Sequence, residues 1–123
     1  MIDIDLLEKY EAVRKLYKKT EIIFEKDHLA THYYQIVSGA VKMNNFNDEG
    51  REFIQGIFYK DQSFGEPPLF LNRTYPANAE ATEDAELLCI SKENFLKLTF
   101  ENPSVSIKII EIFRKTMSLS NNI

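Results

Sequence analysis

The stretch FGEPPLFLNRTYPA at residues 64–77 carries the most information about the fold of this chain. Gly65 lets the backbone approach a ligand closely because it has no Cβ, and Glu66 can accept hydrogen bonds from ligand hydroxyls. Residues 67–71 are expected to form one helical turn whose free N–H groups face an anion. The segment therefore predicts a phosphate or carboxylate cradle, and the alternative is a proline-punctuated loop that covers a barrel.

Length and composition indicate one domain of 123 residues with a net charge of −4. This length is enough to bury a core, and the acidic balance does not support a broad basic surface for nucleic acid. The one cysteine, Cys89, excludes an internal disulfide and predicts a reducing, cytoplasmic setting. It lies in an apolar run, so we interpret it as a buried strand residue. We expect a soluble protein without a membrane partner, because no signal peptide and no apolar run of about 20 residues is present.

The predicted elements are a helix, a series of short strands and then further helices. Residues 5–19 place apolar side chains at the spacing of an amphipathic helix, with Asp5 and Glu8 at its capped start. Short β-rich runs separated by turn residues favour a sandwich or barrel. The sequence at residues 47–50, Asn-Asp-Glu-Gly, predicts an exposed hairpin tip. The predicted strands are residues 20–24, 33–37, 40–46, 52–59, 77–81 and 86–90.

Two helices are predicted to follow the strands. Ser91 caps a short helix that runs through residue 100, and Pro103 begins another because proline is preferred at the first helical position. The apolar side chains of this last helix form two stripes about 100° apart, so its apolar face is very wide. We expect homodimerisation through it, and the alternative is a helix sunk wholly against its own domain. The residues expected at the dimer contact are Ile109, Ile110, Ile112, Phe113 and Met117.

Several local strings, taken in order, resemble the cyclic-nucleotide-binding domain of Crp/Fnr-type transcription regulators. They are EIIF at 21–24, YQIVSG at 34–39, NDEGRE at 47–52, FGE at 64–66, EDAELLCIS at 83–91 and NP at 102–103. The resemblance implies a mainly β fold, a jelly-roll β-roll (double-stranded β-helix) with flanking helices that ends in a dimerisation helix.

The resemblance covers nearly the whole chain, which is then a single domain at 1–123. It implies an N-terminal helix at 1–19, the roll at 20–90 with a phosphate-binding cassette at 64–77, and C-terminal helices at 91–123. The family's helix-turn-helix would follow residue 123 and is absent from this sequence. We therefore expect either part of a longer regulator or a natural single-domain protein.

The resemblance also assigns ligand contacts to the cassette, and one part of the pattern departs from the family. The family's Gly and Glu, which meet the ligand phosphate and ribose, map onto Gly65 and Glu66. Its Arg, followed by Ser or Thr and then Ala, maps without gaps onto Tyr75, Pro76 and Ala77. Tyr75 carries no positive charge and Pro76 has neither hydroxyl nor N–H. This register predicts the loss of a charge-assisted contact worth about 1.5 to 3 kcal/mol.

A second register is open for the phosphate clamp. Arg73 and Thr74 supply the missing pair if the chain bulges by two residues, which moves a side chain about 6.6 Å along the same face. The ungapped register is simpler, because the downstream strands then align without an insertion. In the family the last helix also contributes polar groups to the ligand's base, and Ser120 and Asn121 fall in about that place. A frayed polar terminus is the alternative there.

Four positions near turns lack the glycine that is common in the family. We expect these loops to need other backbone conformations. The residues are Thr20, Asp27, Tyr59 and Asp61.

The sequence predicts the effector-sensing and dimerisation domain of a Crp/Fnr-type transcription regulator with an altered or lost cyclic nucleotide site. A functional cyclic AMP or cyclic GMP module and a ligand-free protein-interaction module are the alternatives. No cofactor is identified, a cyclic nucleotide is the candidate effector, and DNA is expected to bind only through a further C-terminal domain. No catalysis or metal site is predicted, since His28 and His32 flank a predicted loop and strand and no catalytic triad stands out.

Overall fold

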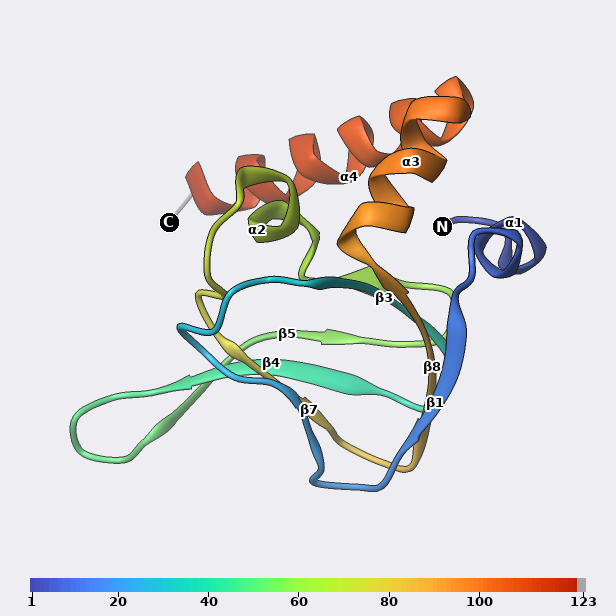
Figure 1. The fold of residues 1–123 in the computed structure, drawn as a ribbon. Helices are drawn as coiled ribbons and strands as arrows, with labels where there is room; N and C mark the ends of the chain where they lie inside the picture. Colours follow the sequence, from blue (N-terminus) through green and yellow to red (C-terminus); the bar gives the residue numbers. More distant parts are fainter. Residues whose placement is uncertain (122–123) are drawn as a thin grey trace.

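The computed structural model describes residues 1–121 as two four-stranded antiparallel sheets with flanking helices (Figure 1). One sheet has the strand order β1-β8-β3-β6 and the other β2-β7-β4-β5. Helices α2, α3 and α4 lie on one side of the strands. The predicted mainly β fold with flanking helices is confirmed. The elements are α1 (Ile4–Lys9), β1 (Val13–Tyr17), β2 (Ile22–Phe24), β3 (His32–Ser38), β4 (Val41–Phe46), β5 (Glu52–Phe58), β6 (Ser63–Phe64), α2 (Glu66–Leu71), β7 (Asn78–Ala81), β8 (Ala85–Ser91), α3 (Lys92–Glu101) and α4 (Pro103–Asn121).

The helix predicted over residues 5–19 is wrong beyond its first turns. Helix α1 ends at Lys9, and its amino-terminal cap is Asp3, whose side chain accepts a hydrogen bond from the Asp5 amide at 3.0 Å. Glu11 then takes a positive φ of 71°, a conformation that does not continue a right-handed helix. The following residues form β1 and pair with β8 from Val13 to Tyr17. The apolar spacing alone could not exclude a strand, because Val13 and Tyr17 also fit a period of two.

Strand β8 is the centre of its sheet, since it pairs with β1 on one side and β3 on the other. Its apolar residues from Leu87 to Ile90 are all buried, as in a strand that is covered on both faces. Cys89 is buried there, which confirms its interpretation as a core residue. Strand β6 has only two residues and was not predicted, because no periodic pattern extends over so short a segment.

The hairpin turn forms where the sequence predicts it, but three turns that lack a glycine differ from the expectation. The predicted hairpin tip joins β4 to β5, with Gly50 donating its amide hydrogen bond to the Asn47 carbonyl at 2.9 Å. The expectation of other backbone conformations at the missing glycines is wrong at three positions. Thr20, Asp27 and Asp61 adopt positive φ angles of 75°, 72° and 72°. They keep the left-handed backbone that the turn requires and accept its steric strain.

Consecutive tyrosines of β3 connect the inside of the roll to the helices, because neighbouring side chains of a strand point to opposite faces. Tyr34 stacks on Phe64 at a ring-centroid distance of 5.6 Å, and Tyr33 stacks on Phe95 of α3 at 4.2 Å. Ser91 caps α3 as predicted, accepting a hydrogen bond from the Asn94 amide at 3.2 Å. Across the described chain, no helix has the length and apolar character needed to cross a membrane.

Candidate functional site

The cassette contains a glycine whose backbone conformation and close packing disfavour a side chain. Gly65 has a φ of 79° and stands at the amino-terminal cap of α2. A Cβ at this position would lie 3.1 Å from ring atoms of Phe24 and 3.4 Å from Tyr75. The helical turn predicted within the cassette is confirmed as α2, whose carboxyl-terminal cap, Asn72, adopts the left-handed conformation. The backbone of the cassette therefore rests directly on aromatic side chains.

Glu66 is buried beneath this turn. Its side chain is 4% exposed, and its Oε1 atom has no hydrogen-bond partner among the described residues. Burial raises the pKa of the carboxyl group above its ordinary value, while hydrogen bonds from the Ser63 side chain and the Glu66 backbone amide act in the opposite direction. The carboxylate that the sequence assigns to ligand hydroxyls is thus enclosed by protein.

Tyr75 points inward and fills the place below Gly65. It is 2% exposed and stacks on Phe24 with ring centroids 3.6 Å apart and an interplanar angle of 6°. Its hydroxyl donates a hydrogen bond to the His32 carbonyl at 3.4 Å. Burial raises the pKa of Tyr75 to about 12, so the side chain is neutral at physiological pH. An uncharged ring pair occupies the inner side of the cassette.

Arg73 and Thr74 point away from this ring pair. Both side chains are exposed, and the Arg73 carbonyl accepts a hydrogen bond from the Ala30 amide at 3.2 Å. Thr74 forms an isolated antiparallel bridge with Leu29. Two further backbone hydrogen bonds tie Tyr75 to the residues facing it, at 2.9 Å each. This backbone register holds the Arg73 side chain outside the roll.

The remaining cassette residues are divided between surface and core. Pro76 is exposed, and its carbonyl accepts a hydrogen bond from the Asn45 side chain at 3.0 Å. Ala77 is fully buried. Ser120 and Asn121 belong to the last turn of α4, and their side chains lie outside the described ones, which end at residue 114.

The candidate dimer residues of α4 do not share one environment. Ile109 is 5% exposed and belongs to the core of its own domain. Phe113 is half-buried and packs edge-on against Phe70 of α2 with ring centroids 5.2 Å apart. Ile112 is half-buried, whereas Ile110 is 63% exposed. The side chain of Met117 lies outside the described ones.

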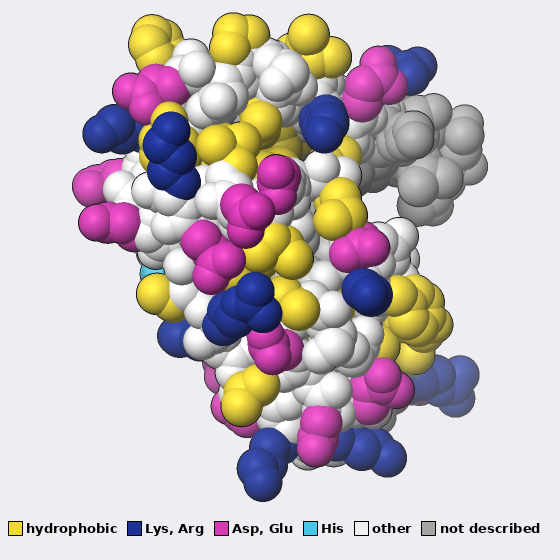
Figure 2. Space-filling model, turned by 90° about the vertical axis from the view of Figure 1, so that its right-hand side faces the viewer, with side chains coloured by type: hydrophobic (Ala, Val, Ile, Leu, Met, Phe, Trp, Pro, Cys, Tyr) yellow, Lys and Arg dark blue, Asp and Glu magenta, His cyan; other side chains and the backbone are white. Residues whose placement is uncertain are grey.

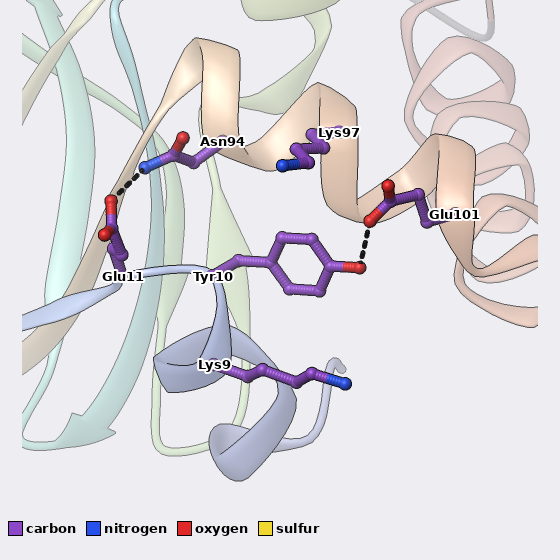
Figure 3. Close-up of a pocket in the computed structure, with 6 residues that line it drawn as sticks. All are labelled: Lys9, Tyr10, Glu11, Asn94, Lys97 and Glu101. Atoms are coloured by element: carbon purple, nitrogen blue, oxygen red, sulfur yellow. Dashed lines mark hydrogen bonds between the residues drawn. The ribbon is translucent and has the colours of Figure 1, made fainter.

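A groove between α1 and α3 lies apart from the cassette on the described surface (Figure 3). It has a volume of about 420 Å³, and the Tyr10 hydroxyl donates a hydrogen bond to Glu101 within it. Figure 2 shows acidic and basic side chains interspersed over one face of the molecule, with no continuous basic surface there. The Nε2 atom of His28 lies 3.7 Å from Oε2 of Glu25, and the Nδ1 atom of His32 lies 2.9 Å from the Thr31 hydroxyl oxygen. Within the described residues, no group of three His, Cys, Asp or Glu side chains could hold a metal ion.

Sequence reasoning identified Tyr75 but missed Phe24. The motif EIIF contributed to the resemblance as a strand, yet its last residue forms the other half of the ring pair. The available signal was the alternation of β2, which turns Phe24 toward the roll. Nothing in the local sequence connects it to a tyrosine so far along the chain.

The described residues thus form a two-sheet β-roll with a short helical cassette. Residues 14–102 match the family model of the cyclic nucleotide-binding domain, and the chain belongs to that family. The predicted resemblance to Crp/Fnr-type effector domains is confirmed by this match and by the following relatives.

The chain is 31% identical over 104 residues to the Cyclic AMP receptor protein of Thermus thermophilus, covering 85% of this chain and 48% of that protein. It is 30% identical to the cGMP-dependent 3′,5′-cGMP phosphodiesterase A of Dictyostelium discoideum, covering 80% of this chain and 11% of that protein. The crystal structure of the Thermus thermophilus catabolite activator protein superposes with a TM-score of 0.87 and 27% identity, over 96% of this chain and 55% of that one. The chain thus spans about half the length of the receptor protein.

Proposed function

We propose that this chain is the effector and dimerisation domain of a Crp/Fnr-type regulator whose cassette does not clamp a cyclic phosphate. The stacked pair of Tyr75 and Phe24 below Gly65 carries the proposal. In the register that the backbone hydrogen bonds support, Tyr75 stands at the position of the family's arginine. A neutral phenol gives a phosphate no charge-assisted contact, which weakens binding by about 1.5 to 3 kcal/mol, or roughly ten- to over a hundredfold.

Calorimetric titration with cyclic AMP and cyclic GMP tests this proposal. We expect no measurable heat from the wild-type protein at high micromolar nucleotide. The double variant Tyr75→Arg/Pro76→Ser, which restores the family's residue types, should bind at least tenfold more tightly than the wild type, and its guanidinium can stack on Phe24 as the phenol does.

Arg73→Ala separates the two registers. Arg73 is exposed, so its removal should leave nucleotide binding unchanged in both backgrounds. Tight binding by the wild type that Arg73→Ala abolishes would contradict the proposal and establish the bulged register. Tight binding that survives Arg73→Ala would also contradict it, because another group would then hold the phosphate.

The exposed side of α4 supports the dimerisation part of the proposal. Ile107 and Ile110 are both 63% exposed on this helix, while Val105 and Ile109 are buried against the domain. A second copy of the chain would cover the exposed isoleucines. Regulation of DNA binding would require a further domain. The two relatives from Thermus thermophilus are long enough to contain one, since this chain covers only about half of each.

A further inference from the structure

Glu66 is the one acidic side chain that is buried in the described part of the chain. The hydroxyl groups of the neighbouring tyrosines donate to other acceptors. Tyr33 donates to the Gln35 Oε1 atom at 2.7 Å, and Tyr75 donates to the His32 carbonyl. Since Oε1 of Glu66 has no hydrogen-bond partner among the described residues, the groups seen to stabilise an ionised carboxylate are the Ser63 side chain and the Glu66 amide.

The charged form of Glu66 is therefore disfavoured in this packing. The titratable groups that act on it, or on which it acts, are the phenols of Tyr33 and Tyr75, whose pKa values burial also raises. None of the described lysine, arginine or histidine side chains contributes to the pKa of Glu66. An unpaired buried carboxylate is relieved by protonation or by movement of its helix into water.

Helix α2 is the element able to yield. It has only six residues, and no side chain caps its amino terminus at Gly65. Its Leu69 is fully buried, and the Asn72 side chain at its carboxyl-terminal cap accepts a hydrogen bond from Lys92. Its Phe70 makes aromatic contacts with Phe95 of α3 at 5.6 Å and Phe113 of α4 at 5.2 Å. Movement of α2 would thus be transmitted to α4 through one ring contact.

We propose that Glu66 is a proton-operated switch of the cassette: the neutral carboxyl seats α2 against β3, and loss of its proton to water drives α2 outward and shifts α4 through Phe70 and Phe113. This switch rests on the proposed function in one respect, namely that α4 is the dimerisation helix and passes the movement to the second copy. The movement itself requires no nucleotide, so it is measured on the ligand-free protein.

The sign of the pH effect follows from the direction of the shift. A folded-state pKa above the unfolded value means that the folded protein holds its proton more strongly, so stability falls as pH rises through the folded pKa. Glu66→Gln keeps the shape and removes the charge. The urea concentration at the midpoint of denaturation should be higher for Glu66→Gln than for the wild type at pH 8, and the two should be equal at pH 4. Glu49→Gln, on the exposed hairpin tip, is the matched control and should show no such difference.

Hydrogen exchange and NMR locate the response. At pH 8 the amides of Leu69, Phe70 and Leu71 should exchange at least tenfold faster in the wild type than in Glu66→Gln, and equally at pH 4. The carbon resonance of the Glu66 carboxyl should titrate with a midpoint above the ordinary value of 4.5. The ring signals of Phe113 should shift with the same midpoint, and Phe70→Leu should remove that shift while α2 still responds.

Three results would overturn the switch: a Glu66 midpoint at or below 4.5, equal α2 exchange in wild type and Glu66→Gln at pH 8, or a stability gain of the variant that is the same at all pH values. None of these measurements involves a nucleotide. Failure of the switch would therefore leave the binding test of the cassette untouched, and tight nucleotide binding would not by itself remove the switch.

Discussion

At the scale of single residues, the backbone of this domain carries strain at turns where the family resemblance predicts glycine. Thr20 has a φ of 75° although it is β-branched, and its amide donates a hydrogen bond to the Ala81 carbonyl at 2.8 Å. The tertiary contact fixes a conformation that the side chain opposes. Sequence reasoning recognised the missing glycines, but it could not tell whether the turn or the residue would prevail, because the Ala81 contact is distant in sequence.

Thr20→Gly should therefore stabilise the protein. The left-handed conformation costs a residue with a Cβ about 1 to 2 kcal/mol, and Thr20→Gly removes this cost. Glycine loses more conformational entropy on folding, which offsets about 0.5 to 1 kcal/mol of the gain. We expect a net gain of roughly 0.5 to 1 kcal/mol in the free energy of unfolding, measured by urea denaturation. Lys19→Gly, at an exposed neighbour without a positive φ, is the control and should destabilise.

Gly39 presents the opposite case, in which no side chain fits. Its φ is 85°, and a Cβ would lie 2.4 Å from the Asp84 carbonyl oxygen and 2.7 Å from the Ala85 Cα atom. Gly50 has a similar φ of 80° but open space around it. Gly39→Ala should cost about 1 to 3 kcal/mol more than Gly50→Ala in thermal or urea unfolding, because the clash adds to the same backbone strain. Equal costs would show that β8 moves aside.

At the scale of elements, most strands could be predicted from the sequence, but β1, β6 and the end of the first helix could not. Runs such as 86–90 and the Asn47–Gly50 turn carry their own signals, so their elements appeared within one or two residues of the predicted bounds. Residues 13–17 do not, since the alternation that defines β1 is weak and Leu16 is 79% exposed. Pairing with β8 decides their conformation, and that pairing is a tertiary event.

The candidate site shows the same division. The position of Gly65 and the short helix after it follow from local chemistry. The inward direction of Tyr75 depends on hydrogen bonds to a facing segment and on stacking with Phe24. A single sequence without those contacts leaves both registers of the clamp open.

Helix α4 gives a prediction about assembly. If the exposed isoleucines form the contact between two copies, Ile110→Glu should raise the dimer dissociation constant at least tenfold, because each copy would bury a charge in place of an apolar side chain. Sedimentation velocity over a concentration series measures this. Ser104→Glu, exposed in the first turn of the same helix, should leave the constant unchanged. A wild type that is monomeric at all concentrations would contradict the dimer.

At the scale of the whole molecule, a buried amide joins the start of the chain to the roll. Gln35 is 1% exposed, accepts a hydrogen bond from the Ile2 amide at 3.1 Å and donates one to the Ile2 carbonyl at 2.7 Å. Its Oε1 atom also accepts from the Tyr33 hydroxyl. The Gln35 amide thus satisfies both backbone polar groups of Ile2, as a neighbouring strand would, while the Ile2 side chain packs in the core.

Gln35→Met should cost about 1 to 3 kcal/mol of unfolding free energy, because it leaves buried polar groups of Ile2 and Tyr33 without partners. Urea denaturation measures the loss. Gln55→Met, in the exposed strand β5, keeps the same chemical change away from the core and should fall within about 0.5 kcal/mol of the wild type. A similar small effect of Gln35→Met would mean that water replaces the lost bonds.

Burial of Cys89 at the centre of β8 also has a practical consequence. Burial raises the pKa of this thiol to about 11, and thiolate is the reactive form, so the native cysteine should react slowly with maleimides at neutral pH. A second cysteine introduced on the surface, such as Leu71→Cys on α2, could then carry a spin label or fluorophore alone. The domain is therefore suited to labelling at a single introduced site on α2.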